Sequence, residues 1–145
     1  MNIEIIEKGL KLDIYGFSGV AVNKEYTKTA FRLMDKMWQV VKTKGLKHKG
    51  LNIWVYEANE KVFAGIELDD TVDQDSGMEH KHVSLAKYAY YKHVGTYNLI
   101  PKAGQTMREE LRKLGYETSA TYIEIYGHWT NDETRLETEL FMSLK

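Results

Sequence analysis

The sequence predicts an α+β fold, in which an antiparallel sheet has two helices on its apolar side. Three observations support this prediction. Residues 26–44 and 98–114 show the 3.6-residue spacing of apolar side chains that is typical of helices. Shorter segments around them alternate apolar and polar side chains, as strands do. The order of strand, helix and hairpin occurs twice, which indicates a duplicated strand–helix–strand–strand unit.

The first half of the chain is expected to contain one long helix. Helical spacing over residues 26–44 places Met37 on the apolar face. We interpret Met34 and Trp38 as side chains that pack into the core from the same face. Gly45 follows, where a residue in the left-handed conformation can end the helix. Strands are expected at residues 2–7, 11–22, 51–57 and 61–68, the last two as a hairpin.

The second half repeats this order. Residues 69–77 are acidic and rich in turn-forming residues, so we interpret them as the linker between the halves. The helix over residues 98–114 accepts Pro101 in its first turn, and Gly115 follows it. Strands are expected at residues 82–93, 121–126 and 136–144. The 145 residues are therefore expected to form one domain, with pseudo-repeat halves of about 1–70 and 78–145.

A shift of seventy residues aligns the two halves. It places Tyr56 on Tyr126, and Trp54 on Glu124. If a pseudo-twofold axis relates the halves, the aromatic side chains of the two strands meet across one central groove. We therefore expect a ligand groove between the halves.

One strand of the second half combines a carboxylate with aromatic rings. Alternation places Ile123 and Ile125 on one face, and Tyr122, Glu124 and Tyr126 on the other. A carboxylate walled by rings can hold an organic cation through charge and cation–π contact. The same surroundings can raise the basicity of a catalytic glutamate. An exposed strand face with no ligand is the plainer interpretation of these five residues alone.

Composition excludes several classes of function. The chain has 43% hydrophobic and 28% charged residues, as soluble globular proteins do, and its net charge of −1 gives no field that would attract nucleic acid or membrane. It has no cysteine, which excludes disulfides, thiol nucleophiles and cysteine-bound metals. There is no glycine-rich phosphate loop, signal peptide or membrane-spanning run, so we expect a cytoplasmic protein without a cofactor.

A short histidine-containing segment offers a second kind of site. Glu79, His80 and His82 could bind a metal, but the sequence ties no further ligand to them. We therefore interpret the segment as a solvated strand edge and expect no metal site.

Two motifs resemble a known family. His93, Gly95 and Tyr97 form a His-x-Gly-x-Tyr run before the second helix, and Glu124 and Tyr126 form a Glu-x-Tyr strand. Together they resemble the gyrase-inhibitor-like small-molecule-binding domain, which is also the effector-binding module of AraC-type and MerR-type multidrug-responsive transcription regulators. The resemblance implies a duplicated fold around a central groove. It also implies that Glu124 contacts cationic aromatic ligands and that Tyr97 opens the second helix.

The predicted ligand site follows from the repeat and the resemblance. Glu124 is the expected charge partner of a hydrophobic cation, and an aromatic wall surrounds it. That wall comprises Trp54, Tyr56, Tyr97, Tyr126 and Tyr90, although alternation leaves open whether Tyr90 or Tyr91 faces the groove. The chain shows no helix-turn-helix, so we expect no direct DNA binding.

Three functions fit these residues. The first is binding of a drug or metabolite, for sensing or sequestration, without turnover. The second is a hydrolase of electrophilic cyclopropane compounds, with Glu124 as the catalytic residue. The third is a protein-interaction module of the gyrase-inhibitor type, whose partner would be gyrase or a separate regulator. We expect the first.

Overall fold

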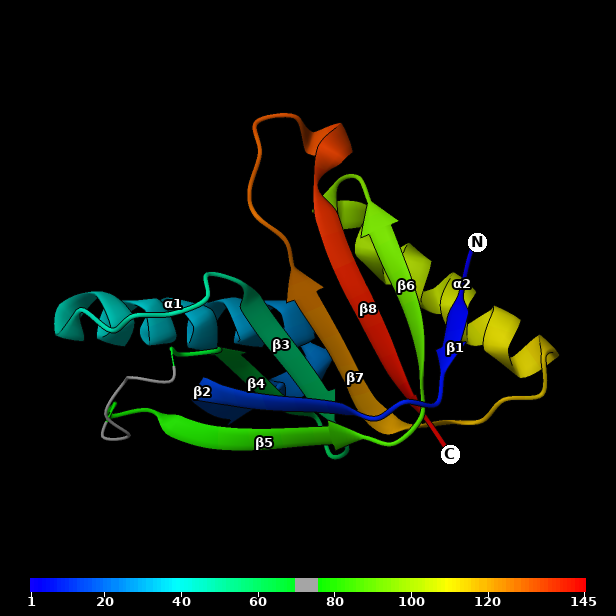
Figure 1. Ribbon diagram of the computed structural model, residues 1–145, viewed down its shortest axis with the longest axis horizontal. Helices are drawn as coiled ribbons and strands as arrows, with labels where there is room; N and C mark the ends of the chain where they lie inside the picture. The colour runs from blue at the N-terminus through cyan, green and yellow to red at the C-terminus, as the bar shows by residue number, and fades with distance from the viewer. Residues whose placement is uncertain (70–75) are drawn as a thin grey trace.

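Antiparallel strands form one continuous sheet (Figure 1). The computed structural model describes residues 1–69 and 76–145, so the expected linker over 69–77 lies largely outside the described residues. Eight strands occur in the described part: β1 (Glu4–Ile6), β2 (Leu10–Val20), β3 (Asn52–Glu57), β4 (Lys61–Ile66), β5 (Glu79–Leu85), β6 (Tyr88–Val94), β7 (Thr118–Tyr126) and β8 (Glu137–Leu144). They pair in the order β1-β6-β8-β7-β3-β4-β2-β5. The predicted α+β class is confirmed.

The two helices lie close to their predicted positions. Helix α1 (Tyr26–Lys44) ends at Gly45, whose φ of 61° is the left-handed conformation that glycine adopts without strain. Helix α2 (Ile100–Lys113) follows the short 3₁₀ helix η2 (Tyr97–Leu99) and has proline in its first turn. Among the described residues, no helix is long and apolar enough to cross a membrane.

Both helices cover the same face of the sheet. Trp54 of β3 is opposite Glu124 of β7, and Glu124 is opposite Leu140 of β8, so the three side chains share a face. Trp54 packs in a cluster with residues of α1, and Leu140 packs in a cluster with residues of α2. Figure 1 shows the two helices behind different halves of the sheet.

The strand register reveals the internal symmetry. The unit β2–α1–β3–β4 has its counterpart in β6–α2–β7–β8, and the two units meet where β3 pairs with β7. Trp54 and Glu124, seventy residues apart, lie directly opposite each other. A pseudo-twofold axis with a seventy-residue shift must therefore pass through this pair.

One predicted strand proves to be two. The strand region expected at residues 82–93 is divided, because β5 ends at Leu85 and β6 begins at Tyr88. The two strands pair with different neighbours, β5 with β2 and β6 with β8. No proline, glycine or other strong turn signal separates the two strands in the sequence, so local pattern did not mark the break.

The face opposite the helices is also buried. Ile53 and Val55 of β3 join one apolar cluster with Ile14 of β2, Val83 of β5 and Phe141 of β8. Strands from the two ends of the sheet thus contribute to the same core. On the helix-bearing face, residues of both α1 and α2 line a cavity.

Candidate functional site

A cavity of about 540 Å³ lies at the junction of the two halves, on the helix-bearing face. Five of the six predicted ligand-binding residues line it: Trp54, Tyr56, Tyr97, Glu124 and Tyr126. Strands β3 and β7 supply four of these five residues, and η2 supplies Tyr97. The cavity therefore lies where the register places the pseudo-twofold axis.

Glu124 is held by three tyrosine hydroxyls. Its side chain is buried, with 7% of the residue exposed. Tyr122 donates a hydrogen bond to Oε2 at 2.7 Å. Tyr126 donates to Oε1 at 2.6 Å, and Tyr56 donates to the same oxygen at a longer 3.3 Å. These bonds fix the orientation of the carboxylate without neutralising its charge.

The three tyrosines are poor proton donors for chemistry. Burial raises the pKa of Tyr56, Tyr122 and Tyr126 well above its usual value, and the negative charge of Glu124 and the hydrogen bond to it raise each further. The hydroxyls therefore stay protonated at neutral pH. They act as hydrogen-bond donors to Glu124.

Aromatic rings form the wall of the cavity. The ring of Tyr126 lies against Trp54, with centroids 4.7 Å apart, and against Tyr97, with centroids 5.6 Å apart. Phe31 of α1 meets Trp54 edge to face at 5.0 Å. Edge-to-face contacts of this kind hold rings firmly and leave some ring faces free for a ligand.

No lysine or arginine of the described residues partners the carboxylate in the cavity. Within residues 1–69 and 76–145, no lysine or arginine lines the cavity or forms an ion pair with Glu124. The guanidinium of Arg108 instead lies over the ring of Tyr122, 5.3 Å from its centroid. The cavity thus combines one negative charge with apolar walls.

The choice of Tyr90 was wrong. Tyr90 lies on the other face of the sheet, opposite Phe141 in register, with the two rings 5.2 Å apart. Its hydroxyl donates to Glu139 at 2.6 Å. Tyr91 points to the helix-bearing face, where it packs with the α2 cluster, and it does not line the cavity either. Strand β6 is separated from β7 by β8, so neither ring reaches the groove.

Sequence reasoning missed part of the lining. Phe31 and Met34 come from α1, and we had interpreted Met34 as core only. His128 and Trp129 come from the segment after β7, and Trp129 is 73% exposed. The remaining lining residues are Thr27, Gly50, Asn52, Asn98, Ile100, Pro101 and Gly127. The spacing of Thr27, Phe31 and Met34 on one helical stripe was the available signal.

A family model matches most of the chain. The model of the GyrI-like small molecule binding domain matches residues 26–145. A search of curated proteins found no match.

Solved structures share the fold at low sequence identity. SAV2435 bound to tetraphenylphosphonium is 17% identical, with a TM-score of 0.65, over 100% of this chain and 94% of that one. The C-terminal domain of EcmrR is 13% identical, with a TM-score of 0.70, over 100% and 99% of the two chains. A hydrolase from Listeria innocua is 11% identical, with a TM-score of 0.57, over 99% and 91%.

Proposed function

The chain belongs to the family of GyrI-like small-molecule-binding domains, and we propose that it binds hydrophobic organic cations in the groove around Glu124. One observation supports the proposal most: a buried carboxylate faces an aromatic cavity in which no described lysine or arginine balances its charge. The proposal includes the expected role, which is sensing or sequestration of a drug or metabolite without turnover.

The electrostatic argument favours a cation over a neutral ligand. A buried charge is costly unless it is paired or fully hydrogen-bonded. Three hydroxyls offset part of this cost for Glu124, and a cation in the cavity would offset more. The rings of Trp54 and Tyr126 offer stacking and cation–π contact to the same ligand.

A relative supports the choice of ligand class. Tetraphenylphosphonium, the ligand of SAV2435, is an aromatic cation whose charge is shielded by four phenyl rings. A cavity of about 540 Å³ with apolar walls suits molecules of this kind. We therefore use it as the first probe.

Calorimetry with a charge-reversed pair tests the proposal. Tetraphenylphosphonium and tetraphenylborate have nearly the same shape and opposite charge. We expect the cation to bind and the anion to bind far more weakly. The variant Glu124→Gln should lose about 1–3 kcal/mol of cation affinity, the scale of a hydrogen bond to a charged group. That loss corresponds to a rise in Kd of about 5- to 150-fold.

Glu139→Gln is the matched control. Glu139 also accepts a hydrogen bond from a tyrosine, Tyr90, but on the opposite face of the sheet. Its replacement should leave cation affinity unchanged. Equal Kd values for the wild type and Glu124→Gln, with both folded by circular dichroism, would contradict the proposal.

A hydrolase is the second candidate. It is favoured by the fold shared with a protein described as a hydrolase from Listeria innocua, and by the carboxylate beside an open cavity. The raised pKa of Tyr126 makes that residue a weak acid, which opposes the second candidate. Mass spectrometry of electrophilic cyclopropane compounds after incubation distinguishes the two. Multiple turnovers that are lost in Glu124→Gln would establish the hydrolase.

A further inference from the structure

The structure supplies a third ligand to the histidine segment that the sequence left incomplete. Strands β2 and β5 pair so that Asp13 lies opposite His82, and Tyr15 lies opposite His80. One ligand atom from each of Asp13, His80 and His82 lies within 4.8 Å of the other two. We propose that these three residues bind a first-row divalent transition metal such as Zn²⁺, Ni²⁺ or Cu²⁺.

A single carboxylate oxygen of Asp13 lies close to both imidazole rings. Oδ1 of Asp13 lies 3.1 Å from Nδ1 of His82, and Nε2 of His80 contacts the same oxygen. The imidazole centroids are 4.4 Å apart. Small rotations of the side chains would bring three ligand atoms to the roughly 2.0–2.2 Å that zinc–nitrogen and zinc–oxygen bonds require.

Neighbouring residues orient this cluster. The ring of Tyr15 stacks on the imidazole of His80, with centroids 4.3 Å apart and planes 6° from parallel. Flat stacking limits the rotation of His80 and directs Nε2 toward Asp13. Metal-binding histidines are commonly fixed in orientation by a hydrogen bond to the other ring nitrogen, and here the stacked ring of Tyr15 restricts the orientation of His80.

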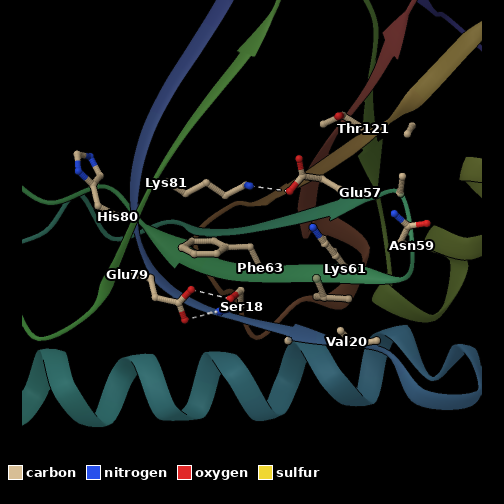
Figure 2. Close-up of a pocket in the computed structure, with 14 residues that line it drawn as sticks. Ser18, Val20, Glu57, Asn59, Lys61, Phe63, Glu79, His80, Lys81 and Thr121 are labelled. Carbon is tan, nitrogen blue, oxygen red and sulfur yellow. Dashed lines mark hydrogen bonds and ion pairs between the residues drawn. The ribbon is translucent and has the colours of Figure 1, made fainter.

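The adjacent charged side chains are engaged elsewhere. Glu79 accepts hydrogen bonds from Ser18, and Lys81 forms an ion pair with Glu57 at 2.6 Å. Figure 2 shows Glu79 directed toward Ser18 and Lys81 directed toward Glu57, within the hollow of about 590 Å³ that Phe63 also lines, whereas the ring of His80 is directed away from Glu79 and Lys81. Alternation along β5 thus places the two histidines on the face opposite Glu79 and Lys81, apart from these hydrogen bonds and this ion pair.

The ligand types select the metal class. Two imidazole nitrogens and one carboxylate oxygen suit Zn²⁺, Ni²⁺ and Cu²⁺, and three protein ligands leave room for water. Ca²⁺ and Mg²⁺ prefer several oxygen ligands, so they should not bind here. All three residues are exposed, so a hydrated ion can reach them without opening the core.

An ion pair is the simpler role for the same residues. A protonated histidine beside Asp13 would form a salt bridge with no metal. The two roles differ in a measurable way, because only a metal site gives saturable binding of one divalent ion. A metal would also join β5, an edge strand of the sheet, to β2 and so stabilise the fold.

Calorimetric titration of tag-free protein with Zn²⁺ tests the site. We expect one ion per chain, a higher melting temperature with Zn²⁺ than with a chelator, and no response to Mg²⁺. The variants Asp13→Asn and His82→Gln should each weaken Zn²⁺ binding about tenfold or more. Visible absorption of bound Co²⁺ should disappear in both variants.

Glu79→Gln is the control, because Glu79 is on the same strand but points to the other face. It should bind Zn²⁺ as the wild type does. The proposal is overturned if the wild type shows no saturable binding, if His80→Gln/His82→Gln retains it, or if Glu79→Gln loses as much affinity as Asp13→Asn. The groove is built on β3 and β7, so its cation affinity serves as a check that each variant is folded.

Discussion

Glu124 and its three tyrosines form a unit in which the carboxylate influences the ionisation of the hydroxyls. The carboxylate accepts hydrogen bonds from Tyr56, Tyr122 and Tyr126, and its charge disfavours loss of a proton from any of them. The arrangement provides a fixed negative charge rather than a proton relay. A binding role uses such a charge directly.

The raised pKa values of Tyr56, Tyr122 and Tyr126 predict how the stability of the fold changes at alkaline pH. Each has a higher pKa in the folded protein than in the unfolded chain, where tyrosine titrates near pH ~10. Their contribution to stability is therefore complete below pH ~10 and is lost as pH rises above it. Above pH ~10, the three tyrosines together should lower the free energy of unfolding by about 4 kcal/mol for each pH unit.

The variant Tyr126→Phe isolates one of these groups. The free energy of unfolding of this variant should fall less steeply above pH ~10 than that of the wild type. The two slopes should differ by about 1.4 kcal/mol per pH unit, the contribution of one tyrosine. Urea unfolding of the wild type and the variant over this range measures the two slopes, and lysine ionisation affects both proteins alike. Identical slopes would show that Tyr126 does not titrate in the expected way.

Individual site residues differ in how far sequence could predict them. Trp54 and Glu124 were predicted to lie together because the seventy-residue repeat aligned them, and in the structure they lie opposite each other and line one cavity. Tyr90 was misplaced because alternation cannot say which face of β6 meets the helices. Asp13 was missed as a partner of His82, because the pairing of β2 with β5 is a long-range contact that no local pattern encodes.

At the level of elements, predictions succeeded where local signals were strong. Helix α1 begins and ends at the predicted residues, since its apolar stripe and Gly45 mark it clearly. The prediction for residues 82–93 was incomplete, because the division into β5 and β6 depends on pairing with strands that are distant in sequence, β2 and β8.

Close contact between neighbouring backbones is a further feature that the sequence pattern alone does not reveal. Gly16 of β2 lies opposite Gly65 of β4, where any side chain would collide with the neighbouring strand.

Gly16→Ala should therefore destabilise the sheet. A Cβ atom there would lie 1.9 Å from the carbonyl oxygen of Ala64, so the backbone must shift. Overpacking of this kind costs about 1–3 kcal/mol. Urea unfolding measures the change. Gly9→Ala is the control, since its Cβ would meet its nearest neighbour, the oxygen of Leu85, at an ordinary 3.5 Å. Equal stability of the two variants would contradict this account.

For the whole molecule, the pseudo-twofold axis explains the position of the groove. Duplication brings two equivalent strands together at the centre of the sheet, and each half adds a helix to the same face. The equivalent positions then diverge: Trp54 supplies a ring where Glu124 supplies a charge. The second half thus supplies the carboxylate of Glu124 and the ring of Tyr126, and the first half adds the ring of Trp54 to the same cavity.

Because Trp54 and Glu124 line one cavity and lie opposite each other in the sheet, we expect a ligand bound at Glu124 to contact Trp54 as well. The variant Trp38→Phe/Trp129→Phe leaves Trp54 as the sole tryptophan and keeps an aromatic ring at position 129, which lines the cavity. We expect saturating tetraphenylphosphonium to quench or shift its fluorescence, because Trp54 is buried against Phe31 and Tyr126 at the wall. Calorimetry on the same variant must first show that the cation binds, since Trp38 donates a hydrogen bond to Asn52 of the lining. Free N-acetyltryptophanamide corrects for collisional quenching. An unchanged spectrum at confirmed saturation would mean that the ligand occupies one half alone and that the shared groove is not its site.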